Sequence, residues 1–466
     1  MPVEKKKGLN ISARSFITAI VVIFILMCGA YVLTLVIPGG TYHRVPDGSG
    51  NLLIDTAGGF AYADGGIPFW KWILSPVLVL GASGSGTLIA VIAFLLVIGG
   101  IFNSLEVCGL MKYMLDRITG RFGGVRYRLM AAILFFFMAL GAAIGSFEEC
   151  VPLVPIVVAL AVSLGWDPMT GIGMSMLAVG CGFASGVCNP FTVGVAQQLA
   201  GLPMFSGVWL RLVSFLLIYG LLFCFVRGYA RKIEKPLSHF HADVIVRDPK
   251  KDRGITWFGG ILCVGILTVL NSALIPQLQS FTMVIVAVMF LVAGTVSCLV
   301  SGMTAGELGR SAWAGVKSII PAVAMILMAS SVKYTLEEAR VLDTILHGAI
   351  GLTEAMPKWS VILFIYLIVL VMNFFIPSGS AKAFMLIPLI VPMAQIFDIS
   401  TQLCIVAFAF GDGFSNVLYP TNPVLLISLG LTDVSYGDWF RWSWKFQGMN
   451  LLLTGAILLF GLIVGY

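Results

Sequence analysis

The sequence predicts an all-α polytopic membrane protein made of two inverted-topology repeats, each with a re-entrant helical hairpin and a broken transmembrane helix. Composition is the first reason: the 466 residues are 59% hydrophobic and 11% charged, whereas soluble chains carry about 25% charged residues. Apolar runs of membrane-spanning length recur along the chain, which is the second reason. The third is an internal repeat at half the chain length.

A shift of 233 positions superposes the two halves without a gap, placing Pro155 on Pro388 and Asn189 on Asn422. Both halves then carry polar residues and Pro or Gly inside otherwise apolar runs. Broken apolar segments at matching places are the best sequence pointer to a transporter's binding site. The predicted divisions are a first repeat (1–228), a cytoplasmic linker (229–254), a linker transmembrane helix (255–276) and a second, inverted repeat (277–466).

The elements of the first half are predicted from the lengths of its apolar runs, from the residues that interrupt helices, and from the positions of its charged residues. The first apolar run is too long for a signal peptide and is interpreted as a true span. Two later arms of about 14–16 residues are too short to cross alone, so they form a hairpin around a polar tip. The predicted ranges are a span at Phe16–Ile37, an outside loop at 39–66, an interfacial helix at Pro68–Gly81, a span at Gly86–Asn103, a basic cytoplasmic stretch at Lys112–Arg128, and hairpin arms at Leu129–Ile144 and Val151–Leu164 around Gly145–Glu149.

A long helix, Gly171–Ala200, is predicted to break at Gly186–Pro190, because Pro190 removes a backbone donor. The chain then crosses back at Val208–Phe225, and Trp257–Ile275 is a span without a counterpart in the first half. In the second half we expect a span at Phe281–Val300, an interfacial helix at Thr304–Val316, a span at Ser318–Lys333, an outside segment at Glu337–Glu354, hairpin arms at Trp359–Phe375 and Phe384–Ile396 around Pro377–Lys382, a helix at Gln402–Leu429 broken at Tyr419–Pro423, and a last span at Trp444–Val464. Four crossings in each half and the linker span make nine, so the second half is predicted to have the opposite orientation in the membrane to the first.

Basic residues orient the chain. Lys5, Lys6 and Lys7 precede the first span, and the stretch 227–253 holds eight Lys or Arg residues. An excess of Lys and Arg marks cytoplasmic loops, so the N-terminus is predicted to be cytoplasmic. The nine Cys are scattered without metal-binding spacing, and we expect neither a metal site nor a disulfide framework. The basic residues flank spans, so no nucleic-acid partner is expected.

Four charged residues lie in the broken regions: Glu148, Glu149, Lys382 and Asp412. A charge at membrane depth costs at least about 2.5–3.5 kcal/mol, so each is a functional hypothesis by default. The alternatives are a structural ion pair between Glu149 and Lys382, and a Glu148 that faces water at a shallow tip. Neutral polar residues accompany them at Ser146, Asn189, Thr192, Ser378, Ser380, Asn416, Thr421 and Asn422.

Half-helix N-termini at the breaks favour anions, and freed carbonyls suit Na⁺. Three carboxylates against one Lys favour a cationic or zwitterionic substrate, or a proton or Na⁺ that binds before an anion. Glu148, Glu149 and Asp412 are therefore predicted to hold the cationic group or coupling ion, and Lys382 a carboxylate. The full prediction for substrate binding is Ser146, Glu148, Glu149, Asn189, Thr192, Ser378, Gly379, Ser380, Lys382, Thr421 and Asn422, and for the coupling ion Glu149, Asp412 and Asn416.

Three runs, GSFEECVPLVPI, CNPFTVGVAQQLAG and NFFIPSGSAKAFMLIPLIVP, resemble those of the YfcC-type carriers. These carriers belong to the C4-dicarboxylate anaerobic carrier and arginine/ornithine antiporter-like group of the ion transporter superfamily. The resemblance covers essentially the whole chain. It implies a homodimer with a static scaffold and a mobile domain that moves like an elevator, driven by Na⁺, H⁺ or exchange. It also implies a hairpin-tip role for Ser146–Glu149 and Ser378–Lys382, and a broken-helix role for Asn189–Thr192 and Thr421–Pro423.

The predicted function is a secondary active transporter of the bacterial inner membrane that moves basic amino acids, arginine- or ornithine-like, by antiport or ion coupling. It is not predicted to be an enzyme, and no cofactor is expected beyond a coupling Na⁺ or H⁺. A first alternative is a Na⁺- or H⁺-coupled carrier of C4-dicarboxylates or other organic anions. A second is a channel or a structural membrane protein in which the charges form ion pairs.

Overall fold

The computed structural model describes residues 13–46, 52–54, 59–82, 85–145, 147–203, 205–235, 247–272, 282–352, 356–432 and 434–466. These ranges are mostly helical, and eight of the described helices are long and apolar enough to cross a membrane. The prediction of a helical, multi-pass membrane protein is confirmed at this level. The candidate spans are Leu88–Val107, Arg126–Ala143, Pro168–Ser185, Val208–Ile233, Ala305–Glu338, Lys358–Phe375, Gly379–Ile396 and Tyr436–Val464.

The segment after the first helix contains short strands that the all-α prediction missed. Tyr42 donates its backbone N–H to Asp343 Oδ2 at 3.0 Å, and Gly40 N donates to Arg340 O at 2.9 Å. These partners lie about 300 positions later in the chain, so no local pattern could reveal them. The elements here are α1 (Ala13–Val36), β1 (Gly40–Tyr42) paired with β4 (Phe60–Tyr62), and β2 (Arg44–Pro46) paired with β3 (Leu52–Ile54), both antiparallel.

The interruptions predicted at the first hairpin tip and in the first broken helix are present, while the re-entrant course of the hairpin stays a prediction, since its first arm is long enough to cross a membrane. Helix α6 ends at Gly145, whose left-handed φ of +71° suits glycine, and α9 ends at Gly186 in the same way. The elements are α2 (Phe69–Ile73), α3 (Ser75–Leu78), η1 (Val79–Gly81), α4 (Ser85–Val107), α5 (Leu110–Phe122), η2 (Gly123–Val125), α6 (Arg126–Ile144), the 3₁₀ segment η3 (Glu148–Leu153), α7 (Val154–Ser163), α8 (Pro168–Ile172), the π-helical η4 (Gly173–Leu177), α9 (Ala178–Ser185), the π-helical η5 (Pro190–Gly194), α10 (Val195–Leu199) and α11 (Val208–Ile233).

The second half corrects two boundaries. A single helix, α15, replaces the predicted interfacial helix and separate span, because Thr304 and Glu307 form a capping box at its start and Pro321 does not end it. Helix α18 begins at Gly379 rather than Phe384, so Lys382 is helical. The elements are α12 (Pro249–Ser272), α14 (Thr282–Val300), α15 (Ala305–Glu338), α16 (Val341–Gly351), α17 (Lys358–Phe375), α18 (Gly379–Ile396), α19 (Thr401–Gly413), η8 (Phe414–Val417), α20 (Pro423–Gly430) and α21 (Tyr436–Val464).

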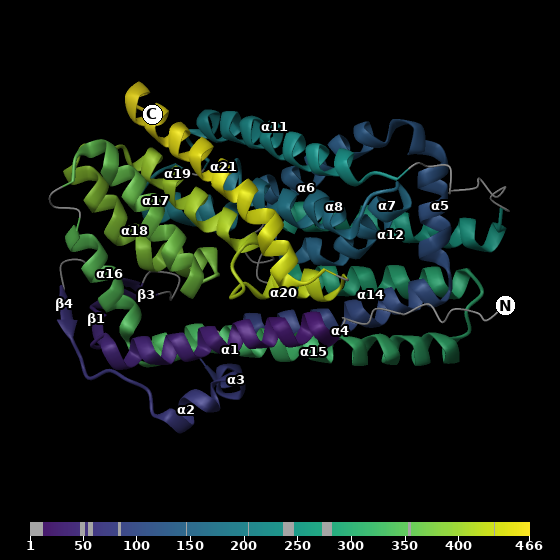
Figure 1. Cartoon of the computed structure of the whole chain (residues 1–466), viewed down its shortest axis with the longest axis horizontal. Coiled ribbons are helices and arrows are strands. Elements are labelled where there is room, and N and C mark those ends of the chain that lie inside the picture. The colour runs from purple at the N-terminus through teal and green to yellow at the C-terminus, as the bar shows by residue number, and fades with distance from the viewer. Residues whose placement is uncertain are drawn as a thin grey trace.

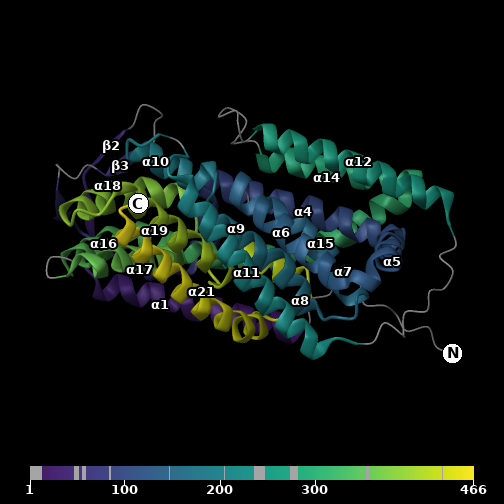
Figure 2. The ribbon, with the colours of Figure 1, turned by 90° about the horizontal axis from the view of Figure 1, so that it is seen from above.

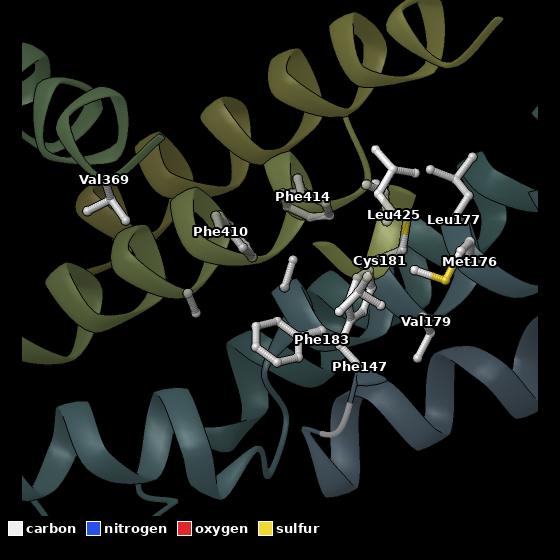
Figure 3. Packing of buried hydrophobic residues seen from close by; sticks show 14 of the residues in the cluster. Phe147, Met176, Leu177, Val179, Cys181, Phe183, Val369, Phe410, Phe414 and Leu425 are labelled. Atoms are coloured by element: carbon white, nitrogen blue, oxygen red, sulfur yellow. The ribbon is translucent and has the colours of Figure 1, made fainter. Parts of the chain in front are cut away.

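The elements form a layered bundle with the broken helices at its centre. Helices α1 and α15 run together along one edge, and α11 lies along the opposite edge (Figure 1). Helices α12 and α14 pack against each other at a third edge (Figure 2). Around the broken helices the core is aromatic: Phe147 lies 6.2 Å from Phe183 between ring centroids, and Phe410 lies 5.8 Å from Phe414 (Figure 3).

Elements that are equivalent under the 233-residue shift make equivalent contacts. Segment η3 of the first hairpin contacts α20 of the second half. Helix α18 of the second hairpin contacts η5 and α10 of the first half, which are the shifted counterparts of α20. Helices α9 and α19, which lie in the two broken regions, contact each other directly. Each hairpin tip therefore meets the broken helix of the other half.

Candidate functional site

A wholly buried ion pair lies where the second hairpin meets the second broken helix. Lys382 Nζ is 2.6 Å from Asp412 Oδ1, and both side chains are 0% exposed. Lys382 lies in the first turn of α18, and Asp412 lies in the last turn of α19. The sequence placed both residues in broken regions but did not pair them. Removing one partner would leave an uncompensated buried charge, so the two depend on each other.

A chain of amides extends from this pair. Lys382 Nζ also donates to Asn373 Oδ1 of α17. Asn373 Nδ2 donates to Ser415 Oγ at 2.7 Å and to Asn416 Oδ1 at 2.9 Å, and Asn422 Nδ2 donates to the same Asn416 oxygen at 2.9 Å. Asn373 and Ser415 were missed by the sequence reasoning. The available signal was one Asn in the apolar run that precedes the second hairpin tip.

Three of the predicted polar residues cap their own helical segments. Ser378 Oγ accepts from Ala381 N at 3.4 Å, and Asn422 Oδ1 accepts from Val424 N at 2.9 Å. Asn189 Oδ1 accepts from Thr192 N at 3.2 Å. N-cap side chains satisfy backbone donors that the helix itself leaves open. The broken-helix positions are thus confirmed as helix starts, while their role in binding a substrate stays a prediction.

At the second hairpin tip, the backbone lies very close to a residue of the first half. A Cβ on Gly379 would lie 2.5 Å from Thr192 Cγ2 and 2.6 Å from Asp412 Oδ2. A Cβ on Gly145 would lie 2.0 Å from Asn189 Oδ1. Such distances are below those of real carbon contacts, so both tips need glycine. Thr192, Gly379 and Asp412, predicted from separate stretches, are therefore brought together.

Several buried oxygens of predicted site residues have no hydrogen-bond partner among the described residues. They are Thr192 Oγ1, Thr421 Oγ1 and Asp412 Oδ2. The Thr192 and Thr421 side chains are 1% and 4% exposed, so solvent does not satisfy them. Unpaired buried polar groups carry a desolvation cost and call for an explanation. Carboxylate and hydroxyl oxygens together can accept from an ammonium or guanidinium group, or coordinate a hard cation.

The first hairpin tip is described in part. Ser146 lies outside the described residues, as do the side chains of Glu148 and Glu149. The backbone of the two glutamates begins η3, between Phe147 at 3% exposure and Cys150 at 4% exposure. Their predicted roles in substrate and ion binding therefore stay predictions. In the second tip, Ser380 is half-buried on the first turn of α18.

A cavity of about 770 Å³ lies elsewhere, between the strand region and the end of α15. Its charged lining includes Arg44, Glu337, Arg340 and Asp343, and Arg44 pairs with Asp343 at 2.8 Å. None of the predicted site residues lines this cavity. Met385 does, and it lies one helical turn beyond Lys382 on α18. The cavity is thus adjacent to the second hairpin but distinct from the buried pair.

This chain is similar in sequence to two bacterial proteins. A candidate basic amino acid antiporter of Escherichia coli (strain K12), YfcC, is 32% identical over 417 residues, which cover 82% of this chain and 80% of that protein. An uncharacterized protein of Haemophilus influenzae is 24% identical over 383 residues, covering 79% and 74% of the two chains.

Two solved transporter structures are similar at lower levels. The YdaH transporter of Alcanivorax borkumensis matches with a TM-score of 0.44 and 19% identity, covering 97% of this chain and 99% of that one. MtrF of Neisseria gonorrhoeae, from a class of antimetabolite efflux pumps, matches with a TM-score of 0.47 and 15% identity, covering 96% and 95%. Both likenesses are too weak to bear on the site.

The family model of the C4-dicarboxylate anaerobic carriers, DcuC, matches residues 16–463. That range holds both hairpins, both broken helices and every residue of the candidate site. The chain therefore belongs to the C4-dicarboxylate anaerobic carrier (DcuC) family and is a membrane transporter.

Proposed function

We propose that this protein is a secondary active transporter that exchanges basic amino acids, arginine- or ornithine-like, across the bacterial inner membrane. The observation that carries the proposal is the buried pair of Lys382 and Asp412 at the meeting point of hairpin and broken helices. An amino acid brings both charges: its carboxylate can replace Asp412 at Lys382, and its cationic group can replace Lys382 at Asp412. Neither protein charge is then left without a partner, which would be costly in a buried site.

The second cation of a basic amino acid also has a candidate partner. Lys382 and Asp412 neutralise each other, so Glu148 and Glu149 supply the remaining formal charges of the predicted site. Two carboxylates at the opposite tip favour a substrate with an additional positive group. The YfcC relative, whose name describes a candidate basic amino acid antiporter, supports the same substrate class.

We further infer a coupling ion and an elevator movement. Thr192, Thr421 and Asp412 contribute oxygens that suit Na⁺, and a proton on a glutamate is the alternative coupling ion. The hairpins and broken helices would move together against a scaffold that contains α1, α4, α14 and α15, which pack against one another. The reciprocal contacts of the two hairpins support an inverted repeat. In this proposal the N-terminus is cytoplasmic and the protein is a homodimer.

The alternative substrate is a C4-dicarboxylate, and the observation that favours it is a buried Lys382 in a chain of this family. A dicarboxylate could pair with Lys382 but would leave Asp412 without its cation. That site would therefore need a bound proton or Na⁺ before the substrate enters. The two proposals differ in the charge that must accompany transport.

A counterflow measurement in proteoliposomes tests the function. Vesicles preloaded with unlabelled arginine or ornithine should accumulate labelled arginine, and vesicles loaded with malate or succinate should not. Accumulation driven only by the dicarboxylates would contradict the amino acid proposal and support the alternative. Flux without saturation or counter-substrate stimulation would indicate a channel. Protein-free vesicles and vesicles with the Asp412→Asn variant serve as controls for leak.

A further inference from the structure

Three arginine side chains gather around one tyrosine ring at the end of two membrane-spanning helices. The guanidinium carbons of Arg126, Arg227 and Arg231 lie 5.6, 5.5 and 5.8 Å from the centre of the Tyr127 ring. Arg126 and Tyr127 begin α6, and the other two arginines lie in the last two turns of α11. We call these four residues the arginine cluster. None of them belongs to the proposed transport site.

The arginine cluster carries more positive charge than its neighbours compensate. Glu234 accepts from Arg126 at 2.9 Å and from the Tyr127 hydroxyl. Arg227 and Arg231 form no ion pair with a described residue, and Arg227 Nε is buried without a hydrogen-bond partner in the described part of the chain. A further carboxylate, on Asp167, accepts instead from Tyr229 and Thr170. Among the described residues, these two cationic groups are thus held together without a counter-charge.

An aromatic seam, formed by Phe135, Phe215, Tyr219 and Phe223, continues from the arginine cluster along α6 and α11. Phe135 of α6 lies 5.8 Å from Phe215 and 5.7 Å from Tyr219 of α11, and Tyr219 stacks on Phe223 at 6.4 Å. Phe223 in turn lies 5.6 Å from the Arg227 guanidinium. Phe135 is 48% exposed, and α11 forms an outer edge of the molecule (Figure 1).

We propose that the arginine cluster and the aromatic seam bind an anionic phospholipid. The phosphate group would take paired N–H donors from Arg227 and Arg231, whose planar guanidinium groups match phosphate oxygens. The start of α6 adds the positive end of a helix to the same place. An acyl chain would lie along the seam, within the span of the two helices. Basic pockets between transmembrane helices bind such head groups in membrane proteins.

The test measures lipid binding to the full-length protein in nanodiscs. Discs of phosphatidylcholine are compared with discs that contain increasing phosphatidylglycerol or cardiolipin, and the thermal unfolding midpoint reports occupancy. The Arg227→Gln/Arg231→Gln protein should need about 30-fold more anionic lipid for the same stabilisation, since each interfacial basic residue contributes about fivefold.

A control variant removes the same amount of charge from the two helices, α6 and α11, that form the arginine cluster. Arg128 and Lys232 are exposed basic residues of α6 and α11 that have no described contact with the Tyr127 ring. The Arg128→Gln/Lys232→Gln protein should bind anionic lipid within about twofold of the wild type. An equal loss in both double variants would overturn the proposal, because it would show only general surface charge. Equal stabilisation by inorganic phosphate in phosphatidylcholine discs would overturn it too, since a free anion would then suffice.

A second double variant tests the proposal even if the Arg227→Gln/Arg231→Gln protein folds poorly. Arg227→Lys/Arg231→Lys keeps both charges but loses the planar donor geometry. It should show an intermediate loss of lipid affinity, several-fold below the wild type. Wild-type affinity in this variant would contradict recognition by the guanidinium groups. Because the arginine cluster lies outside the transport site, counterflow in lipid-matched vesicles separates this proposal from the proposed function.

Discussion

The two hairpin tips correspond in sequence but are built differently. The second tip is the capped start of an 18-residue helix, α18, and its charged residue, Lys382, is buried and paired. The first tip ends α6 at a left-handed Gly145 and continues as a six-residue 3₁₀ segment, η3, that begins at Glu148. A 3₁₀ segment has poorer hydrogen-bond geometry than an α-helix and persists only in short pieces.

This difference in structure suggests different roles for the charged residues of the two halves. In the second half, charge is fixed by a hydrogen-bonded network of Lys382, Asp412, Asn373 and Asn416. In the first half, two carboxylates of the sequence begin a 3₁₀ segment rather than an α-helix. We infer that the second tip supplies a preformed, structurally costly charge pair, while the first supplies the acids that respond to substrate or ion.

Asp412→Asn should have the largest effect. Lys382 would keep its charge in a buried site without a carboxylate, which costs about 3–5 kcal/mol of unfolding free energy. Thermal unfolding in detergent should show a clearly lower midpoint, and counterflow should be lost. The double variant Lys382→Met/Asp412→Leu removes both charges and should recover most of the stability without recovering transport. An unchanged midpoint in Asp412→Asn would contradict the importance of the pair.

Glu149→Gln should abolish transport without a matching loss of stability. The predicted role of Glu149 is to bind the cationic group or coupling ion, and its neutral isostere cannot do so. Counterflow should fall to the protein-free level, while the free energy of unfolding stays within about 1 kcal/mol of the wild type, because Gln keeps the size and polarity of Glu. Glu148→Gln is the companion variant that shows which acid carries the role. Normal arginine exchange by the Glu149→Gln protein would remove this residue from the site.

Gly379→Ala should destabilise the second tip by about 1–3 kcal/mol, because overpacking forces backbone or side-chain shifts. The new Cβ would meet Thr192 Cγ2 at 2.5 Å and Asp412 Oδ2 at 2.6 Å. Gly306→Ala is the matched control, since a Cβ there meets nothing within 4 Å and lies in the first turn of α15. The difference between the unfolding midpoints of the two variants measures how much the crowding at Gly379 destabilises the protein. Equal midpoints would show that the tip can move aside.

Ser378→Ala should have the smallest effect of the series, about 1 kcal/mol, the usual cost of losing an N-cap side chain. Ser378 Oγ accepts from Ala381 N at a long 3.4 Å, so a value at the low end is expected. Ser378→Asn, which keeps a cap acceptor, should restore stability. If Ser378 also binds substrate, the KM for arginine should rise in Ser378→Ala beyond what the stability loss explains. An unchanged KM would leave capping as its role.

The positions of the breaks could be predicted from sequence because Gly and Pro limit the backbone locally. Gly186 and Asn422 end or begin helices where the sequence placed interruptions. The start of α18 could not be placed as well, since Ser378 caps a helix that continues through Pro388. The unbroken α15 was missed because the predicted split between Val316 and Ser318 followed the match to the first half, where an interfacial helix and a span are separate, whereas α15 continues through that point.

The sequence by itself determined the membrane class, the repeat and the residues that lie in the broken regions, because each depends on hydrophobicity, spacing and backbone restrictions along the chain. Only the tertiary structure decided that Lys382 pairs with Asp412, a residue 30 positions later on another helix. It also brought Asn373 to the pair and Thr192 to Gly379. Pairings of this kind depend on which faces of separate helices meet, and that relation is set by packing over long sequence distances rather than by any local pattern.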